Sequence, residues 1–236
     1  MKNPKISVCV PCYNAEREVL KCYQKLSSVL RQSKFFYEII FAQDGSADRT
    51  EEVGLRLAQQ DRKVIFISFP RRMGKGFGLR NCFKVARGKY LIVYDVDCPV
   101  APEAMIEMVK SAEREHYDII LCRRKILNYP FLRKVASKGY LLLTKIFFHH
   151  KFKDLQAGFK LIRRKAVEKL KLESDGFVID TELVVKALRR GFKIGEMEFE
   201  WRFSRESSSI SPRIVKTSLK MFFDLLRLWL NLLRAS

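Results

Sequence analysis

The sequence has no long hydrophobic run. None of its apolar segments approaches the roughly 20 residues that a membrane-spanning helix needs. The N-terminus reads MKNPK, is polar and leads directly into a strand-like segment, so it does not have the pattern of a signal peptide. We therefore expect a chain that does not cross a membrane.

Cysteine is also sparse, with six residues, at positions 9, 12, 22, 82, 98 and 122. Cys9 and Cys12 have C-x-x-C spacing, but no second pair follows at the spacing of a zinc finger. Cys9 lies inside the apolar run ISVCVP, so strand packing explains it better than a metal or redox role. Free cysteines without an export signal favour a reducing cytoplasm.

Acidic residues are few: 26 Asp and Glu stand against 46 Lys and Arg, a formal net charge of +20. Such a charge favours polyanionic partners such as nucleic acid, an anionic membrane or phosphorylated ligands. Between Leu121 and Lys165 there are thirteen cations and one acid, Asp154. We do not expect a nucleic-acid-binding module, because no groove-reading or base-stacking motif is present and the cations alternate with apolar residues.

Strand-like and helix-like segments alternate through the first half of the chain. The expected strands are KISVCVPCYN, which we expect to break at Pro11, then YEIIFAQD, KVIFISFP, KYLIVYD and YDIILCRR. We also expect Asp48 to cap the helix after the second strand. The alternation predicts an α/β fold with a mostly parallel sheet and helices on both faces.

Polar clusters follow four of these strands. They are residues 11–14, 44–46, 71–78 and 95–97. Because ligands of open α/β sheets bind at the carboxyl ends of the strands, four such clusters predict one site at that edge.

The last cluster contains two aspartates, Asp95 and Asp97, separated by one residue. Two carboxylates on one turn supply the hard oxygen ligands that Mg²⁺ or Mn²⁺ prefers alongside substrate phosphates. Taken alone, the pair also fits a turn with two solvated acids, or a helix cap at Asp97 before Pro99.

The second half contains two segments that mix cations with large apolar residues at helical spacing. We expect residues 131–152 to form an amphipathic insert facing a membrane within a catalytic domain at 1–210, and residues 211–236 to form a basic amphipathic C-terminal helix. Core or dimer packing is the alternative for the tail.

Several motifs together resemble a known family. VPCYNAE, QDGSADRT, RRMGKGFGLRNCFKVARGKY and DVD after YLIVY stand in the order found in family 2 glycosyltransferases of the GT-A fold. DLQAGFKLIRRKAV and FVIDTELVVKALRRGFKIGEMEFEW resemble the polyprenyl (dolichyl) phosphate hexose synthases, and the D-x-Q-x-G-F-K-L form leans towards the glucose-type enzymes. The resemblance runs from about Ile6 to Ser209.

The resemblance implies roles for particular residues. Those matching the binding of the nucleotide sugar are Pro11, Tyr13, Glu16, Asp44, Lys75, Arg80 and Asp95. Asp95 and Asp97 match the metal-binding D-x-D, which implies Mg²⁺ or Mn²⁺ as cofactor. Ala15 and Gln43 stand where many members have an acid, and Cys98-Pro99 follows the D-x-D where many mannose synthases have Leu-Gln or Leu-His.

For the acceptor phosphate, the resemblance implies Arg123, Arg133, Ser137 and Arg202, with Arg205 as a second choice for the last. Arg133 and Ser137 are one helical turn apart and can face one phosphate. The residues implied to act in catalysis are Asp97, Arg123 and Arg133. We expect Asp180 and Glu182 to start a helix and support the site rather than to act as a base.

The implied reaction is an inverting, metal-dependent transfer of a hexose from GDP-mannose or UDP-glucose to polyprenyl phosphate. A peripheral protein on the cytoplasmic face of a membrane would carry it out. A family 2 enzyme with a glycan or lipid hydroxyl acceptor is an alternative. A nucleotidyltransferase is disfavoured because PCYNAE replaces its glycine-rich loop, and a non-catalytic membrane adaptor is disfavoured by Asp95 and Asp97.

Overall fold

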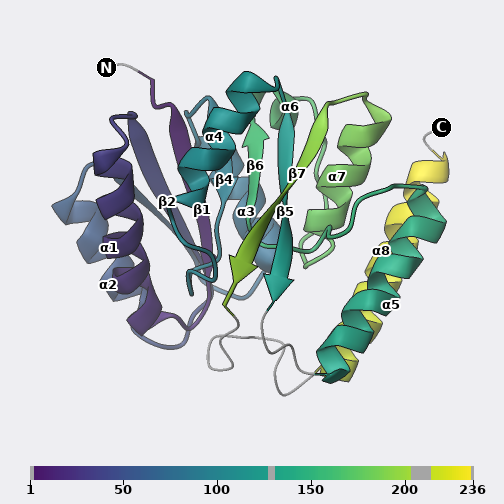
Figure 1. Ribbon diagram of the computed structural model, residues 1–236. Coiled ribbons are helices and arrows are strands. Elements are labelled where there is room, and N and C mark those ends of the chain that lie inside the picture. Colours follow the sequence, from purple (N-terminus) through teal and green to yellow (C-terminus); the bar gives the residue numbers. More distant parts are fainter. Residues whose placement is uncertain (1–2, 127–130, 203–213, 235–236) are drawn as a thin grey trace.

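The computed structural model describes residues 3–126, 131–202 and 214–234, and its strands form one sheet in the order β3-β2-β1-β4-β6-β5-β7 (Figure 1). All neighbouring strands are parallel except those paired with β6. This confirms the predicted α/β fold with a mostly parallel sheet. The strands are β1 Ile6–Cys12, β2 Tyr37–Asp44, β3 Val64–Phe69, β4 Tyr90–Val93, β5 Ile119–Ile126, β6 Lys160–Arg163 and β7 Ile194–Trp201.

Helices cover both faces of the sheet, because the strand residues that point to either face are apolar. Ile39 and Phe41 of β2 belong to the core under one helical layer, and Ile40 and Ala42 belong to the core under the other. The first layer is α1 Glu16–Gln32, α2 Thr50–Gln60 and α4 Ala104–Arg114. The second layer is α3 Lys75–Val85, α6 Arg164–Glu168 and α7 Ile179–Arg189.

The sequence predicted that the first strand breaks at Pro11, but β1 continues to Cys12. The strand β4 ends its pairing with β1 at Cys9, whose carbonyl accepts a hydrogen bond from the backbone of Tyr94. Pro11 lies two residues further along, so its nitrogen points to the same side as the Cys9 carbonyl, beyond the end of the pairing with β4. No strand hydrogen bond is therefore lost at Pro11, which stays in register with Ala42 of β2 on the other side.

Two long helices, α5 Phe131–Phe148 and α8 Ile214–Arg234, lie side by side at the outer side of α7 (Figure 1). Leu225, Leu228 and Leu232 of α8 are buried against Val178 and Val185. Phe147 of α5 stacks on Trp229 of α8, with ring centroids 5.2 Å apart. Among the described residues, no helix is both long enough and apolar enough to cross a membrane.

Candidate active site

The first two polar clusters meet at the carboxyl ends of β1 and β2. The backbone N–H of Asn14 donates to the Ser46 hydroxyl at 3.0 Å, and the Asn14 side-chain oxygen accepts from the backbone of Ala47 at 2.9 Å. Gln43, at the position where many family members have an acid, accepts from the backbone of Ser46 and donates to the Ser68 hydroxyl. Gln43 is therefore part of the framework that fixes this edge.

The third cluster is tied to the second through Asp44. This buried carboxylate accepts hydrogen bonds from the backbone N–H groups of Met73 and Gly74. Gly74 has a φ of 110°, which a residue with a side chain rarely adopts, and a Cβ there would lie 2.3 Å from the Asp175 carbonyl oxygen. Asp44 thus sets the shape of the loop that leads into α3.

The fourth cluster joins the third through Lys75, the first residue of α3. Its ammonium lies 3.1 Å from Asp95 and 3.5 Å from Asp180. Burial disfavours the charged form of Lys75, but the attraction of Asp180 and Asp95 outweighs it and raises the pKa of the ammonium. The four clusters therefore lie together at one edge of the sheet, as the sequence predicted.

A buried ion pair stands behind Lys75. Lys160 on β6 and Asp180 on α7 are 1% and 4% exposed, and their charged atoms lie 2.6 Å apart. Lys160 also donates to the Ala157 carbonyl. Asp180 lies in the first turn of α7, as the sequence predicted, and is shared between two ammonium groups.

Gly158 gives Asp95 its space. A Cβ on this residue would lie 1.9 Å from a carboxylate oxygen of Asp95. Gly158 follows the buried Ala157 and leads into β6. The Asp95 side chain therefore packs directly against the backbone of this segment, and it can do so only because residue 158 is a glycine.

The turn after the D-x-D motif is closed by Cys98 and Pro99. Cys98 has a φ of 52°, and its N–H donates to the Asp95 carbonyl at 3.0 Å. A hydrogen bond from the Cys22 thiol lowers the pKa of Cys98, and Lys25 lowers it further against the opposing effect of burial. The Pro99 carbonyl accepts from the backbone N–H of Arg202 at 2.8 Å, which brings the end of β7 beside this turn.

The start of α3 is covered by the segment at residues 172–176. The Asp175 carbonyl accepts hydrogen bonds from the backbone of Gly76 and Phe77. Glu182, which is 1% exposed, accepts from the backbone of Glu173 and Ser174 and so fixes this segment to α7. The structure places Arg80 here, with its guanidinium on the Asp175 carboxylate and the Leu172 carbonyl.

The first-loop residues lie at the same edge. Pro11 is the penultimate residue of β1, and the guanidinium of Arg72 stacks over the ring of Tyr13, 4.0 Å from its centroid. The Glu16 carboxylate accepts from the backbone of Arg49, and the Glu16 N–H donates to Asp48. Asp48 also accepts from the backbone N–H of Thr50, the first residue of α2. The N-cap of α2 is Arg49 and has no side-chain capping hydrogen bond, so the prediction that Asp48 caps this helix was wrong.

The residues implied for the acceptor lie on β5, on α5 and directly after β7. Arg123, near the end of β5, is paired with Glu198 of β7 at 2.8 Å and is 37% exposed. Arg133 and Ser137 both lie on α5, where the Arg133 side chain is outside the described residues. Arg202 is exposed beside the D-x-D turn, and Arg205 lies outside the described part. The structure thus connects Arg202 to the turn.

The donor set at this edge suits a hard divalent cation. Asp95 and Asp97 supply carboxylate oxygens on one turn, and the Lys75 ammonium already lies against Asp95 as a cation would. Within residues 3–126, 131–202 and 214–234, no group of three or more His, Cys, Asp and Glu side chains could hold a metal. Asp95 and Asp97 are the residues that would hold Mg²⁺ or Mn²⁺ here, with substrate phosphates and water completing the ligands.

Sequence reasoning missed several of these residues. In the sequence, Lys160 is one of thirteen cations between residues 121 and 165, and nothing distinguishes it from the others. Only its position in the short antiparallel strand β6 directs it to Asp180. Gln156 donates to the hydroxyls of Tyr140 and Thr181 and so links α5 to α7. The sequence carried one signal for them, the segment DLQAGFK, in which Gln156, Gly158 and Lys160 alternate.

Comparisons with known proteins agree with this architecture. The sequence matches the family model for glycosyl transferase family 2 over residues 7–171. It is 31% identical to glycosyltransferase AglD of Haloferax volcanii, over 97% of this chain and 37% of that protein. It is 30% identical to dolichyl-phosphate beta-glucosyltransferase ALG5D of Trichomonas vaginalis, over 94% of this chain and 72% of that one.

Solved structures show the same fold. The structure of glucosyl-3-phosphoglycerate synthase from Mycobacterium tuberculosis with Mn²⁺, uridine diphosphate and phosphoglyceric acid aligns with a TM-score of 0.75 and 17% identity. The alignment covers 96% of this chain and 78% of that one. With the family match over more than half of its residues, the chain belongs to glycosyl transferase family 2, and its relatives are consistent with the polyprenyl-phosphate hexose synthase branch.

Proposed function

We propose that this chain transfers a hexose from a nucleotide sugar to a polyprenyl phosphate, with inversion and with Mg²⁺ or Mn²⁺. The observation that carries the proposal is the set of contacts around Asp95. Lys75 lies 3.1 Å from it, and Gly158 leaves it just enough room at the carboxyl edge of the sheet. These contacts hold a carboxylate at the strand ends, where it is suited to a divalent ion that carries the diphosphate of a nucleotide sugar.

The state of Asp180 supports a phosphate acceptor. A hydroxyl acceptor needs a general base, whereas a phosphate monoester is already largely ionised at pH 7. Asp180 is buried, and its two oxygens are paired with the ammonium groups of Lys160 and Lys75. A site whose buried carboxylate is neutralised in this way is better suited to an acceptor that is already ionised.

The chain's own residues would then position and stabilise the reactants. Arg123 and Arg202, with Arg133 and Ser137 of α5, would hold the acceptor phosphate, and Lys75 would contact the phosphates of the donor. Asp95 and Asp97 would hold the divalent ion, which when bound neutralises charge on the leaving diphosphate. The Lys75–Asp95 pair would keep that carboxylate in place before the substrate arrives.

The outer faces of α5 and α8 support binding to a membrane surface. Val135, Leu142 and Ile146 on α5 are 51–61% exposed, and Leu219, Phe223, Leu230 and Leu233 on α8 are 41–63% exposed. Lys138 and Lys145 flank the first stripe in sequence, and Lys220, Arg227 and Arg234 flank the second. Exposed apolar stripes edged with cations fit the interface of an anionic bilayer.

The donor is proposed to be UDP-glucose, with GDP-mannose as the second choice. The segment DLQAGFKL resembles the glucose-type synthases, and one relative with 30% identity is named a dolichyl-phosphate glucosyltransferase. A donor screen tests this choice. Labelled UDP-glucose, GDP-mannose and UDP-N-acetylhexosamine are each incubated with the chain, Mn²⁺ and polyprenyl phosphate, and the label in the organic phase is counted.

We expect label from UDP-glucose in the organic phase, and none with Asp97→Ala. Label from GDP-mannose alone would correct the donor and keep the reaction. Absence of label from every donor, or full transfer by Asp97→Ala, would contradict the proposal.

A flotation assay tests the membrane surface separately. Leu142→Ser/Phe223→Ser should lose binding to anionic vesicles, whereas Leu20→Ser/Leu55→Ser removes apolar residues with 44% and 47% exposure from α1 and α2 and should retain it. Equal binding by both variants would contradict an interface formed by α5 and α8.

A further inference from the structure

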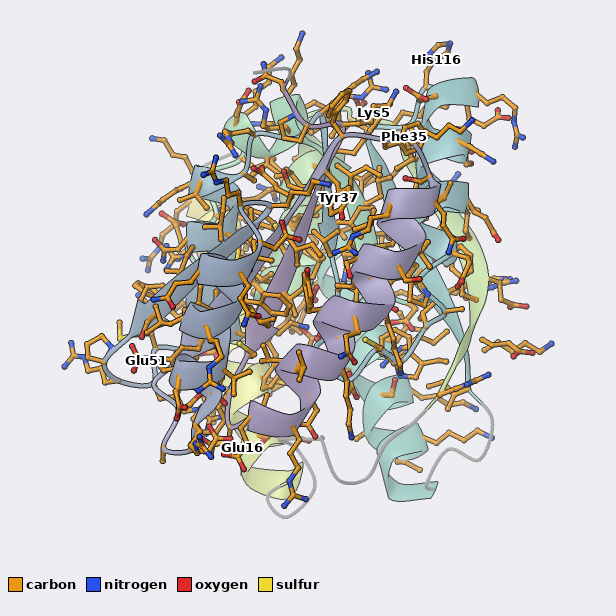
Figure 2. All side chains as sticks on the ribbon, turned by 90° about the vertical axis from the view of Figure 1, so that its left-hand side faces the viewer. Lys5, Glu16, Phe35, Tyr37, Glu51 and His116 are labelled. Atoms are coloured by element: carbon orange, nitrogen blue, oxygen red, sulfur yellow. The ribbon has the colours of Figure 1, made fainter. Side chains whose placement is uncertain are left out.

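We infer that the chain carries a second anion-binding site, for a phosphate-bearing ligand, at the opposite edge of the sheet. A cavity of about 720 Å³ is formed there by residues 3–5, residues 34–36, Arg87, Lys89 and residues 163–165. These segments adjoin the amino ends of β1, β2 and β4, whereas the candidate active site lies at the carboxyl ends. Figure 2 shows Lys5 and Phe35 at one end of the molecule and Glu16 at the other. We call this cavity the amino-edge pocket.

All charged residues that line the amino-edge pocket are cationic. Seven of its eleven lining residues are lysine or arginine, and none is acidic. Five of the seven are paired with four carboxylates outside the lining, namely those of Glu38, Glu113, Asp118 and Glu168. Within the part of the chain that the structure describes, seven cations and four paired carboxylates leave a net charge of +3, in a concave surface that concentrates its field.

One of these cations is held in place before any ligand binds. The carboxylate of Glu38, which is 2% exposed, accepts from the backbone, the Nε and the Nη2 of Arg87. The Arg87 side chain is nonetheless 60% exposed, and within the described residues its Nη1 makes no hydrogen bond. A guanidinium fixed on one side and open on the other is suited to a phosphate oxygen.

Two further cations are available. Lys34 and Lys165 are both exposed at the rim, and neither forms an ion pair with any residue that the structure describes. Lys34 lies in the loop between α1 and β2 and has a φ of 59°. These lysines can respond to a polyanion at little cost to the fold.

The same pocket offers an aromatic surface. Phe35 lies under the Lys5 ammonium, which is 5.4 Å from its ring centroid, and Phe36 is 59% exposed. The cavity falls within the range of about 300–1,000 Å³ typical of small-ligand sites. Several cations beside two phenylalanines fit a ligand that joins phosphates to an apolar or aromatic group. A nucleotide and the headgroup region of an anionic phospholipid share that chemistry.

The test uses the full chain in a buffer with a chelator, so that divalent ions do not support binding at Asp95 and Asp97. Inorganic triphosphate and ATP are titrated by calorimetry, and vesicles with and without a phosphoinositide are tested by flotation. The pocket variant is Lys34→Glu/Lys165→Glu. The matched control is Lys21→Glu/Lys153→Glu, which changes the net charge equally at two exposed lysines outside the pocket.

We expect the pocket variant to bind the phosphate probe at least about tenfold more weakly than wild type, and the control to stay within about twofold. Loss in the titration would identify a soluble ligand, and loss only on vesicles would identify a lipid headgroup. ATP should bind more tightly than triphosphate, and Phe36→Ala should remove that difference. Equal weakening in pocket and control variants, or no binding of any probe, would overturn the inference.

Discussion

We predict that loss of the buried Lys160–Asp180 pair lowers the stability of the fold. Measuring this loss in Asp180→Asn also distinguishes a supporting role for Asp180 from a catalytic one. In Asp180→Asn, the Lys160 ammonium stays 1% exposed but loses its counter-charge. Removing one partner of a buried pair costs about 3–5 kcal/mol. For a chain of this size each kcal/mol lowers Tm by about 2–4 °C, so we expect Tm to fall by about 6–20 °C.

Calorimetric melting of wild type and variant measures this fall. The double variant Lys160→Met/Asp180→Leu removes both charges and should recover more than half of it. Glu52→Gln breaks exposed pairs with Arg49 and Arg56 and serves as control, with an expected change of at most about 1 kcal/mol. A Tm for Asp180→Asn within about 2 °C of wild type, together with lost transfer activity, would refute the supporting role and indicate a catalytic base.

Two further predictions concern the D-x-D turn. Gly158→Ala should force the Asp95 carboxylate to rotate away from a Cβ 1.9 Å distant and weaken Mn²⁺ binding by about tenfold in a titration. Gly139→Ala, which meets nothing within 4 Å, should leave Mn²⁺ binding unchanged, and equal affinity in both variants would contradict the packing argument. Brief iodoacetamide treatment of the native chain should label Cys98 first, because the pKa of Cys98 is lowered and the other five cysteines are buried. Peptide mass spectrometry measures the labelling, and faster labelling of any other cysteine would contradict this.

The sheet and the position of the site could be predicted because their signals are local. Apolar runs that end in polar residues mark the strand ends, and parallel pairing must bring such ends together. The contacts of Asn14 with Ser46, Asp44 with Gly74 and Lys75 with Asp95 follow from that rule.

The rest depends on contacts between residues far apart in the sequence. Nothing near Glu182 in the chain indicates that it fixes the segment covering α3. Arg80 matched a nucleotide-side position, yet its guanidinium contacts Asp175, 95 residues away. The prediction for Pro11 was wrong because it considered the missing N–H without knowing that the neighbouring strand had already ended.

The Cys98-Pro99 step shows a similar limit. As a sequence it departs from the pattern of many relatives and has no evident purpose. In the fold, the Cys98 N–H closes the turn onto Asp95, and the Pro99 carbonyl anchors Arg202. Both contacts use backbone atoms, which the identity of a side chain does not reveal.

The proposed reaction requires that the acceptor is a phosphate. The most direct measurement compares polyprenyl phosphate with the matching polyprenol as acceptors, using the donor identified by the screen and saturating Mn²⁺. We expect label in the lipid fraction with polyprenyl phosphate and none with polyprenol, because both oxygens of Asp180 are already paired with the ammonium groups of Lys160 and Lys75. Transfer to polyprenol at a rate equal to or above that for polyprenyl phosphate would contradict it.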